Sequence, residues 1–122
     1  MESVVVDSSV AIKWFVQQPC SNEAHLVLDQ YRSGSLQLLV PDLLYAEYGN
    51  IVWKKHRLQG LVAADATAII PALQTLPLSI TVTSSLPTDA YHLAAAHQRT
   101  VYDMMNVALS VREQCRLVTA DE

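Results

Sequence analysis

Three consecutive β-branched residues near the start of the chain, Val4–Val6, restrict its fold more than any other feature. Such a run is typical of a short strand that is buried on both faces. It ends at Asp7, which is followed by two serines and then by an apolar helical pattern. Asp7 is therefore expected at the carboxyl end of a first strand, where ligands bind in open α/β sheets. An alternative is that Asp7 only caps the next helix, a role that Ser8 or Ser9 could also fill.

Strand patterns alternate with helical patterns along the rest of the chain. This alternation predicts right-handed crossovers and a mainly parallel sheet within one α/β domain. A helix that starts after Pro41–Asp42 carries Glu47 on its apolar stripe, where a carboxylate needs a partner. The expected strands span residues 4–6, 36–40, 78–82 and 116–119, and the longer helices span 43–57, 61–74 and 104–114.

Four acidic residues have related places in this pattern. Asp7 follows the first strand, Glu47 lies early in the helix after the second, and Asp121 follows the fourth. Asp103 precedes the helix that leads into the fourth strand, so it reaches the same edge if that helix packs antiparallel to the strands. Taken singly, Asp103 could be only a helix cap, Asp121 only a turn residue and Glu47 an exposed side chain. Together the four predict a shared acidic site.

Carboxylates gathered in one place repel each other. In an effective dielectric of about 20, the repulsion reaches about 4 kcal/mol for a pair separated by about 4 Å. A hard divalent cation such as Mg²⁺ removes it, because Mg²⁺ takes oxygen ligands and bridges to phosphate. Such a site activates water and neutralises charge in phosphodiester cleavage, with one metal ion or two.

Charge and composition exclude several classes of protein. A net charge of −4 and a pI of about 5.4 argue against coating nucleic acid through a broad basic surface. Cys20 and Cys115 are far apart and stand in no zinc motif, which suits buried, inert thiols in a reducing cytoplasm. No apolar run is long enough for a membrane span, and the N-terminus lacks the pattern of a signal peptide.

With these residues assembled, the chain resembles the PIN domain family, and within it the VapC-type toxin ribonucleases of bacterial toxin–antitoxin pairs. The resemblance implies an αβα sandwich and Mg²⁺- or Mn²⁺-dependent RNA cleavage, with Asp7, Glu47, Asp103 and Asp121 as the catalytic, metal-binding acids. It also implies support from Ser9 and Thr119, a homodimer, and inhibition by a cognate antitoxin. The pieces that carry it are Val5–Phe15, Pro41–Glu47, Val101–Asp103 with Ala108–Ser110, and Leu117–Asp121.

The sequence departs from the family pattern at two places. Met104–Asn106 stands where relatives commonly have a small residue and then an aromatic one, and the sequence stops at Glu122, where relatives usually continue into a further helix and strand. The expected structure is thus a single PIN-like domain over residues 1–122, a three-layer αβα sandwich that lacks the last strand.

Two classes of function follow. The first is a metal-dependent endoribonuclease that acts as a toxin, and retention of all four acids favours it. The second is a PIN-like module that binds a protein or RNA partner without cleavage. A Mg²⁺-binding receiver domain is a third reading, which we set aside because it needs an aspartate after the third strand. Thr83–Ser85 stands there instead.

Overall fold

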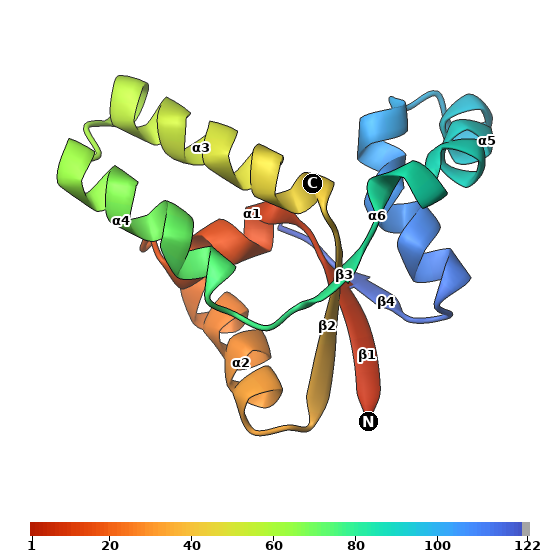
Figure 1. Cartoon of the computed structure of the whole chain (residues 1–122), viewed down its shortest axis with the longest axis horizontal. Coiled ribbons are helices and arrows are strands. Elements are labelled where there is room, and N and C mark those ends of the chain that lie inside the picture. The colour runs from red at the N-terminus through yellow and green to blue at the C-terminus, as the bar shows by residue number, and fades with distance from the viewer. Residues whose placement is uncertain (121–122) are drawn as a thin grey trace.

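A computed structural model describes residues 1–120, which fold around one sheet. Within this part of the chain the sheet has four parallel strands in the order β3-β2-β1-β4 (Figure 1). The strands are β1 (Glu2–Val6), β2 (Leu36–Pro41), β3 (Ser79–Thr81) and β4 (Arg116–Val118). The helices are α1 (Ser8–Ala11), α2 (Ser21–Arg32), α3 (Leu43–Gln59), α4 (Ala63–Gln74), α5 (Pro87–His97) and α6 (Val101–Arg112), and 3₁₀ turns cover Ile12–Trp14 and Thr83–Ser85.

The central strand β1 has helices on both of its faces. Val4, Val5 and Val6 are completely buried, and successive side chains of a strand point to opposite sides. Val4 and Val6 belong to a large apolar cluster with side chains from α1 to α4. Val5 belongs to a smaller cluster with α5 and α6. Helices on either side of a parallel sheet make a three-layer αβα sandwich, which confirms the predicted fold class.

The start of α6 corrects one sequence-based boundary. The helix begins at Val101, so Asp103 lies in its first turn and does not precede it. The Thr100 hydroxyl caps the helix by accepting a hydrogen bond from the Asp103 amide at 3.1 Å. Asp103 therefore does not serve as the N-cap of α6, and its carboxylate is exposed.

The segment before α2 differs from expectation at Cys20. Cys20, with a left-handed φ of 67°, occupies the position before the helix, and Ser21 is the first helical residue. The Ser21 hydroxyl accepts a hydrogen bond from the Gln18 amide at 2.8 Å. Cys20 is exposed and only Cys115 is partly buried. The expectation of two buried thiols was therefore wrong for Cys20, which lies in this exposed turn.

A hydrogen-bonded link between β2 and β3 sets the start of α3. The Thr83 hydroxyl accepts from the Leu43 amide at 3.1 Å and donates to the Asp42 carboxylate, which also accepts from the Thr83 amide at 2.8 Å. The first orphan amide of α3 is thus satisfied from a segment about forty residues away. These contacts fix the turn that leads to Glu47.

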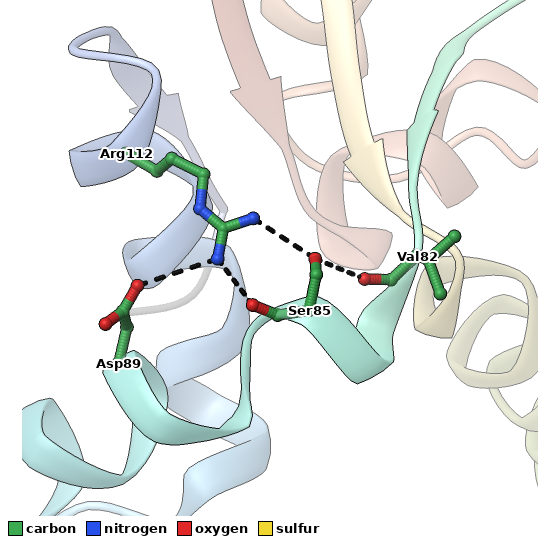
Figure 2. A network of polar contacts seen from close by, with 4 residues as sticks. All are labelled: Val82, Ser85, Asp89 and Arg112. Atoms are coloured by element: carbon green, nitrogen blue, oxygen red, sulfur yellow. Dashed lines mark hydrogen bonds and ion pairs between the residues drawn. The ribbon is translucent and has the colours of Figure 1, made fainter.

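Arg112 ties α6 to the segment that leads into α5 (Figure 2). Its guanidinium donates to the Ser85 hydroxyl at 3.1 Å and to the Ser85 carbonyl, and lies 3.6 Å from the Asp89 carboxylate. The Ser85 hydroxyl in turn donates to the Val82 carbonyl at 2.7 Å. Because Val82 directly follows β3, this network connects α6 to the sheet.

Tyr48 holds α3 against α4. Its ring is 1% exposed, and its hydroxyl donates to the Ile69 carbonyl at 2.7 Å. Burial raises the pKa of Tyr48 to about 12, so the phenol stays a donor at neutral pH. Phe15 meets the Tyr48 ring edge to face at 6.3 Å. This contact joins α3, α4 and the first helical segment.

We predict that Tyr48→Phe lowers the free energy of unfolding by about 1 kcal/mol, because it removes one buried hydrogen bond and leaves the ring in place. Urea unfolding followed by circular dichroism measures the change. Tyr91→Phe is the matched control, since Tyr91 is 59% exposed. An equal loss in both variants would contradict this role of the Tyr48 hydroxyl.

The Asp42 carboxylate makes stability depend on pH. The Thr83 hydroxyl and amide bond its charged form, and they lower the pKa of Asp42 below its usual 3.8. A lowered folded-state pKa stabilises the protein above the unfolded pKa, and this contribution is lost as pH falls through the folded value.

We therefore expect Asp42→Asn to be less stable than the wild type at neutral pH, with the gap narrowing between about pH 5 and pH 2. Melting temperatures across that range measure the gap. Asp29→Asn, an exposed change on α2, should show no such convergence. A constant difference for Asp42→Asn at every pH would count against the link.

Candidate functional site

Asp7 lies at the junction of β1 and α1, and its carboxylate is held by hydroxyls. One oxygen accepts hydrogen bonds from the Ser9 amide at 3.1 Å and from the Ser9 hydroxyl, and the other accepts from the Thr119 hydroxyl at 2.5 Å. Asp7 is only 8% exposed. It is the N-cap of α1, as one sequence reading proposed, and it also lines a cavity. Capping and site formation are therefore compatible.

Ser9 connects Asp7 to the end of β4. Its hydroxyl accepts from the Ala120 amide at 2.9 Å and lies 3.4 Å from the Thr119 hydroxyl. The Asp7 amide donates to the Val118 carbonyl at 3.4 Å. The two residues expected to support the site thus both contact Asp7, one from each end of the chain.

A cavity of about 270 Å³ brings together three of the four predicted acids, Asp7, Glu47 and Asp103. Glu47 is partly buried and Asp103 is exposed. The fourth, Asp121, lies outside the described residues. In Figure 1, α3 and α6 flank the strands from opposite sides, so the cavity joins the two helical layers. Its other lining residues are Ser8, Arg99, Tyr102, Met104, Asn106, Leu117 and Thr119.

The cavity has the donor chemistry of a hard cation site. Carboxylate and amide oxygens suit Mg²⁺ and Mn²⁺, and the Asn106 side-chain oxygen is buried without a hydrogen-bond partner in residues 1–120. Yet no three His, Cys, Asp or Glu side chains of residues 1–120 form a group that could hold a metal by themselves. A cation here would be held by one or two carboxylates together with water, as Mg²⁺ usually is.

Six of the residues that line the cavity were not predicted as site residues, among them Arg99, Tyr102 and Asn106. Asn106 lies three residues after Asp103 and four after Tyr102 on α6, so helical spacing places Asn106 beside both of them. This spacing was a usable signal once the helix was known to begin at Val101. Arg99 lies in the link between α5 and α6, where periodicity gives no information.

We predict that Ser9→Ala and Thr119→Val each cost about 1 kcal/mol of unfolding free energy, because each removes a hydroxyl bonded to the buried Asp7 carboxylate. The two losses should not add, since both hydroxyls share that acceptor. A urea-unfolding double-mutant cycle should show a coupling of about 0.5 kcal/mol or more.

The control cycle pairs Ser9→Ala with Thr67→Val on α4. The Thr67 hydroxyl donates to the Ala63 carbonyl at 2.9 Å, within its own helix. Distant sites of this kind add within about 0.5 kcal/mol. Equal coupling in the two cycles would contradict a shared Asp7 cradle.

No helix within residues 1–120 combines the length and the apolar character needed to cross a bilayer.

Comparison with known proteins identifies the family of the chain. The chain is 31% identical over 121 residues to the protein named Ribonuclease VapC3 of Pyrobaculum aerophilum. The aligned region covers 97% of this chain and 88% of that relative.

Two crystal structures share the fold at lower identity. PAE2754 from Pyrobaculum aerophilum is similar with a TM-score of 0.75 and 20% identity, over 99% of this chain and 76% of that one. VapC20 of Mycobacterium tuberculosis is similar with a TM-score of 0.70 and 13% identity, over 97% of this chain and 89% of that one. That protein is described as a toxin that cleaves the sarcin–ricin loop. The sequence model of the PIN domain family matches residues 4–122 of this chain. The chain therefore belongs to the PIN domain family.

Proposed function

We propose that this protein is a Mg²⁺- or Mn²⁺-dependent endoribonuclease that hydrolyses RNA phosphodiester bonds as the toxin of a toxin–antitoxin pair. The observation that carries the proposal is the cavity in which Asp7, Glu47 and Asp103 meet. Three carboxylates from three separate segments share one cavity in a PIN-domain chain whose relative is named a ribonuclease. Together these favour metal-assisted phosphodiester hydrolysis over unrelated chemistry.

The acidic residues have different environments that suit different tasks. Asp7, buried and bonded to two hydroxyls, is a fixed acceptor at the base of the cavity. Glu47 is a partly buried wall residue on α3. Asp103 is the most exposed of these three acids, which suits a contact with an incoming substrate or an attacking water. Asp121 completes the proposed acidic set.

One or two of these acids, together with water, would hold the cation. When bound, it supplies activation of water and neutralisation of charge on the phosphate. The side chains of the protein then hold the reacting groups in position. Ser9 and Thr119 prevent the Asp7 carboxylate from turning away, and Asp103 can accept a hydrogen bond from an incoming water.

The toxin assignment adds partners to the proposal. RNA is the proposed substrate, a cognate antitoxin the proposed inhibitor, a homodimer the proposed assembly and the cytoplasm the proposed location, with residues 1–122 as one domain. The relatives named VapC3 and VapC20 support the toxin class. Exposed apolar side chains on the helices, such as Trp53 and Val111, are suitable for contact with a partner protein.

A second candidate function is a PIN-like module that binds RNA or protein without cleavage. One observation favours it: the acids of residues 1–120 share a cavity but form no group of three that could hold a metal alone. Under this alternative the chain binds its partner, and divalent cations change neither its stability nor the integrity of the RNA.

We predict that Asp103→Asn slows Mg²⁺-dependent RNA cleavage by about 100-fold or more, because the amide can neither carry the charge nor accept the proton. The exposed position of Asp103 leaves the fold intact, which circular dichroism checks. Cleavage of an unstructured RNA on a denaturing gel, with and without EDTA, gives the rates. Asp65→Asn, the same charge change at an exposed position of α4, is the control.

Metal binding gives a separate readout. Millimolar Mn²⁺ should raise the melting temperature of the wild type by mass action, and less so that of Asp103→Asn. Wild-type cleavage rates in folded Asp103→Asn would contradict the assignment of this residue. RNA binding without cleavage, together with no thermal shift on adding Mn²⁺, would favour the non-cleaving module, whereas cleavage that is indifferent to EDTA would contradict the metal dependence.

A further inference from the structure

The link between α5 and α6 forms one rim of the acidic cavity. Gln98, with a left-handed φ of 54°, ends α5, and the Arg99 amide donates back to the Ala94 carbonyl at 3.1 Å. This closes the helix end in a compact turn. Thr100 then caps α6. Arg99 and Tyr102 follow this fixed turn and both line the cavity.

Arg99 is the cation that lines this cavity within residues 1–120. Its side chain is exposed and makes no ion pair with any residue of that range. Arg112 and Arg116, by contrast, each pair with a carboxylate. A guanidinium matches a phosphate with two parallel hydrogen bonds, which an ammonium cannot do. Arg99 is thus available to an anionic ligand at the mouth of an acidic cavity.

Tyr102 contributes an aromatic ring to the lining of the same cavity. It is 68% exposed, and its ring stacks on no other aromatic ring of residues 1–120. Exposing so much of an aromatic ring forgoes the free energy that burying it would supply. A nucleic acid base supplies a flat face for such a ring, whatever the base.

We propose that Arg99 and Tyr102 form a clamp for single-stranded RNA, in which the guanidinium holds a backbone phosphate and the tyrosine ring stacks on the adjacent base. This inference rests on the proposed ribonuclease function and names the substrate form that the site accepts. Stacking on Tyr102 needs a base that is free of its neighbours, as in a loop or an unpaired strand. An RNA duplex hides those faces, so it binds more weakly.

The charge balance of the chain supports a local anchor. With a net charge of −4 the protein cannot attract RNA through a broad basic surface. Carboxylates at the cavity also repel phosphate until they are neutralised. Arg99, which forms no ion pair with a carboxylate of residues 1–120, offsets this repulsion where the strand enters, and the stacked base sets the register of the strand relative to Asp103.

Fluorescence anisotropy with a labelled uridine-rich single-stranded RNA tests the clamp. Ca²⁺ replaces Mg²⁺ during binding, and a denaturing gel afterwards verifies that the RNA is intact. Arg99→Gln and Tyr102→Ala are compared with Arg32→Gln and Tyr91→Ala. Arg32 is exposed at the end of α2, and Tyr91 is exposed on α5 outside the cavity lining. Each control makes the same chemical change as its clamp variant.

We expect Tyr102→Ala to weaken single-strand binding by about fivefold or more, and Tyr102→Phe, which keeps the ring, to bind like the wild type. Arg99→Gln should weaken binding and also reduce the slope of log affinity against log salt concentration by about 0.7, the value for one lost phosphate contact. In cleavage assays with Mg²⁺, both clamp variants should raise KM more than they lower kcat.

Three outcomes would overturn the clamp. In the first, the clamp variants match their controls in affinity and KM. In the second, an RNA hairpin stem binds the wild type as tightly as the single strand does. If the wild type cleaves RNA, either result overturns the clamp and leaves the proposed function standing. A wild-type protein that neither binds nor cleaves RNA would overturn the proposed function and the clamp together. Because both clamp side chains are exposed, circular dichroism should show wild-type folding in every variant.

Discussion

The hydrogen bonds that meet at Asp7 join the first turn of helix to the last described strand. Ser9 donates from two residues away, whereas Thr119 donates from more than a hundred residues away. Thr119 can reach Asp7 only because β4 pairs in parallel with β1, with Val6 opposite Val118. The pairing of β4 with β1 therefore supplies one of the donors to the Asp7 carboxylate, so this part of the site depends on the sheet and not on the local turn alone.

A nearly buried carboxylate is costly unless hydrogen bonds replace its hydration. The two hydroxyls and the Ser9 amide meet this need with neutral groups, which leave the negative charge of Asp7 uncompensated. A salt bridge would have neutralised that charge and removed the attraction for a cation. Arg112 does not line this cavity, and it is bonded to Ser85 and Asp89 in the structural network of Figure 2.

Local patterns in the sequence predicted the parts of this molecule that depend on local physics. The buried valines of β1, the alternation of strands and helices, and the positions of Asp7 and Glu47 at one edge of the sheet all follow from periodicity and topology. Interactions between residues that are far apart in the sequence could not be predicted in this way. The Thr83 cap on α3 comes from the end of another strand, and the early start of α6 depends on Thr100 outcompeting Asp103 as the cap. Arg99 was missed because a residue in a tight link has no periodic partner that marks its direction.

The cavity lies at the boundary between two apolar clusters of unequal size. The wall that carries Glu47 belongs to the layer packed on Val4 and Val6, which is the larger cluster. The wall that carries Asp103 belongs to the α5–α6 layer, which packs on Val5 through the smaller cluster. Glu47 and Asp103 are therefore held by different packing clusters, one on each face of the sheet, and Asp7 lies at the end of the strand between them. The acidic cavity exists because both layers pack on the two faces of β1, so its shape depends on the packing of Val4 and Val6 on one face and of Val5 on the other.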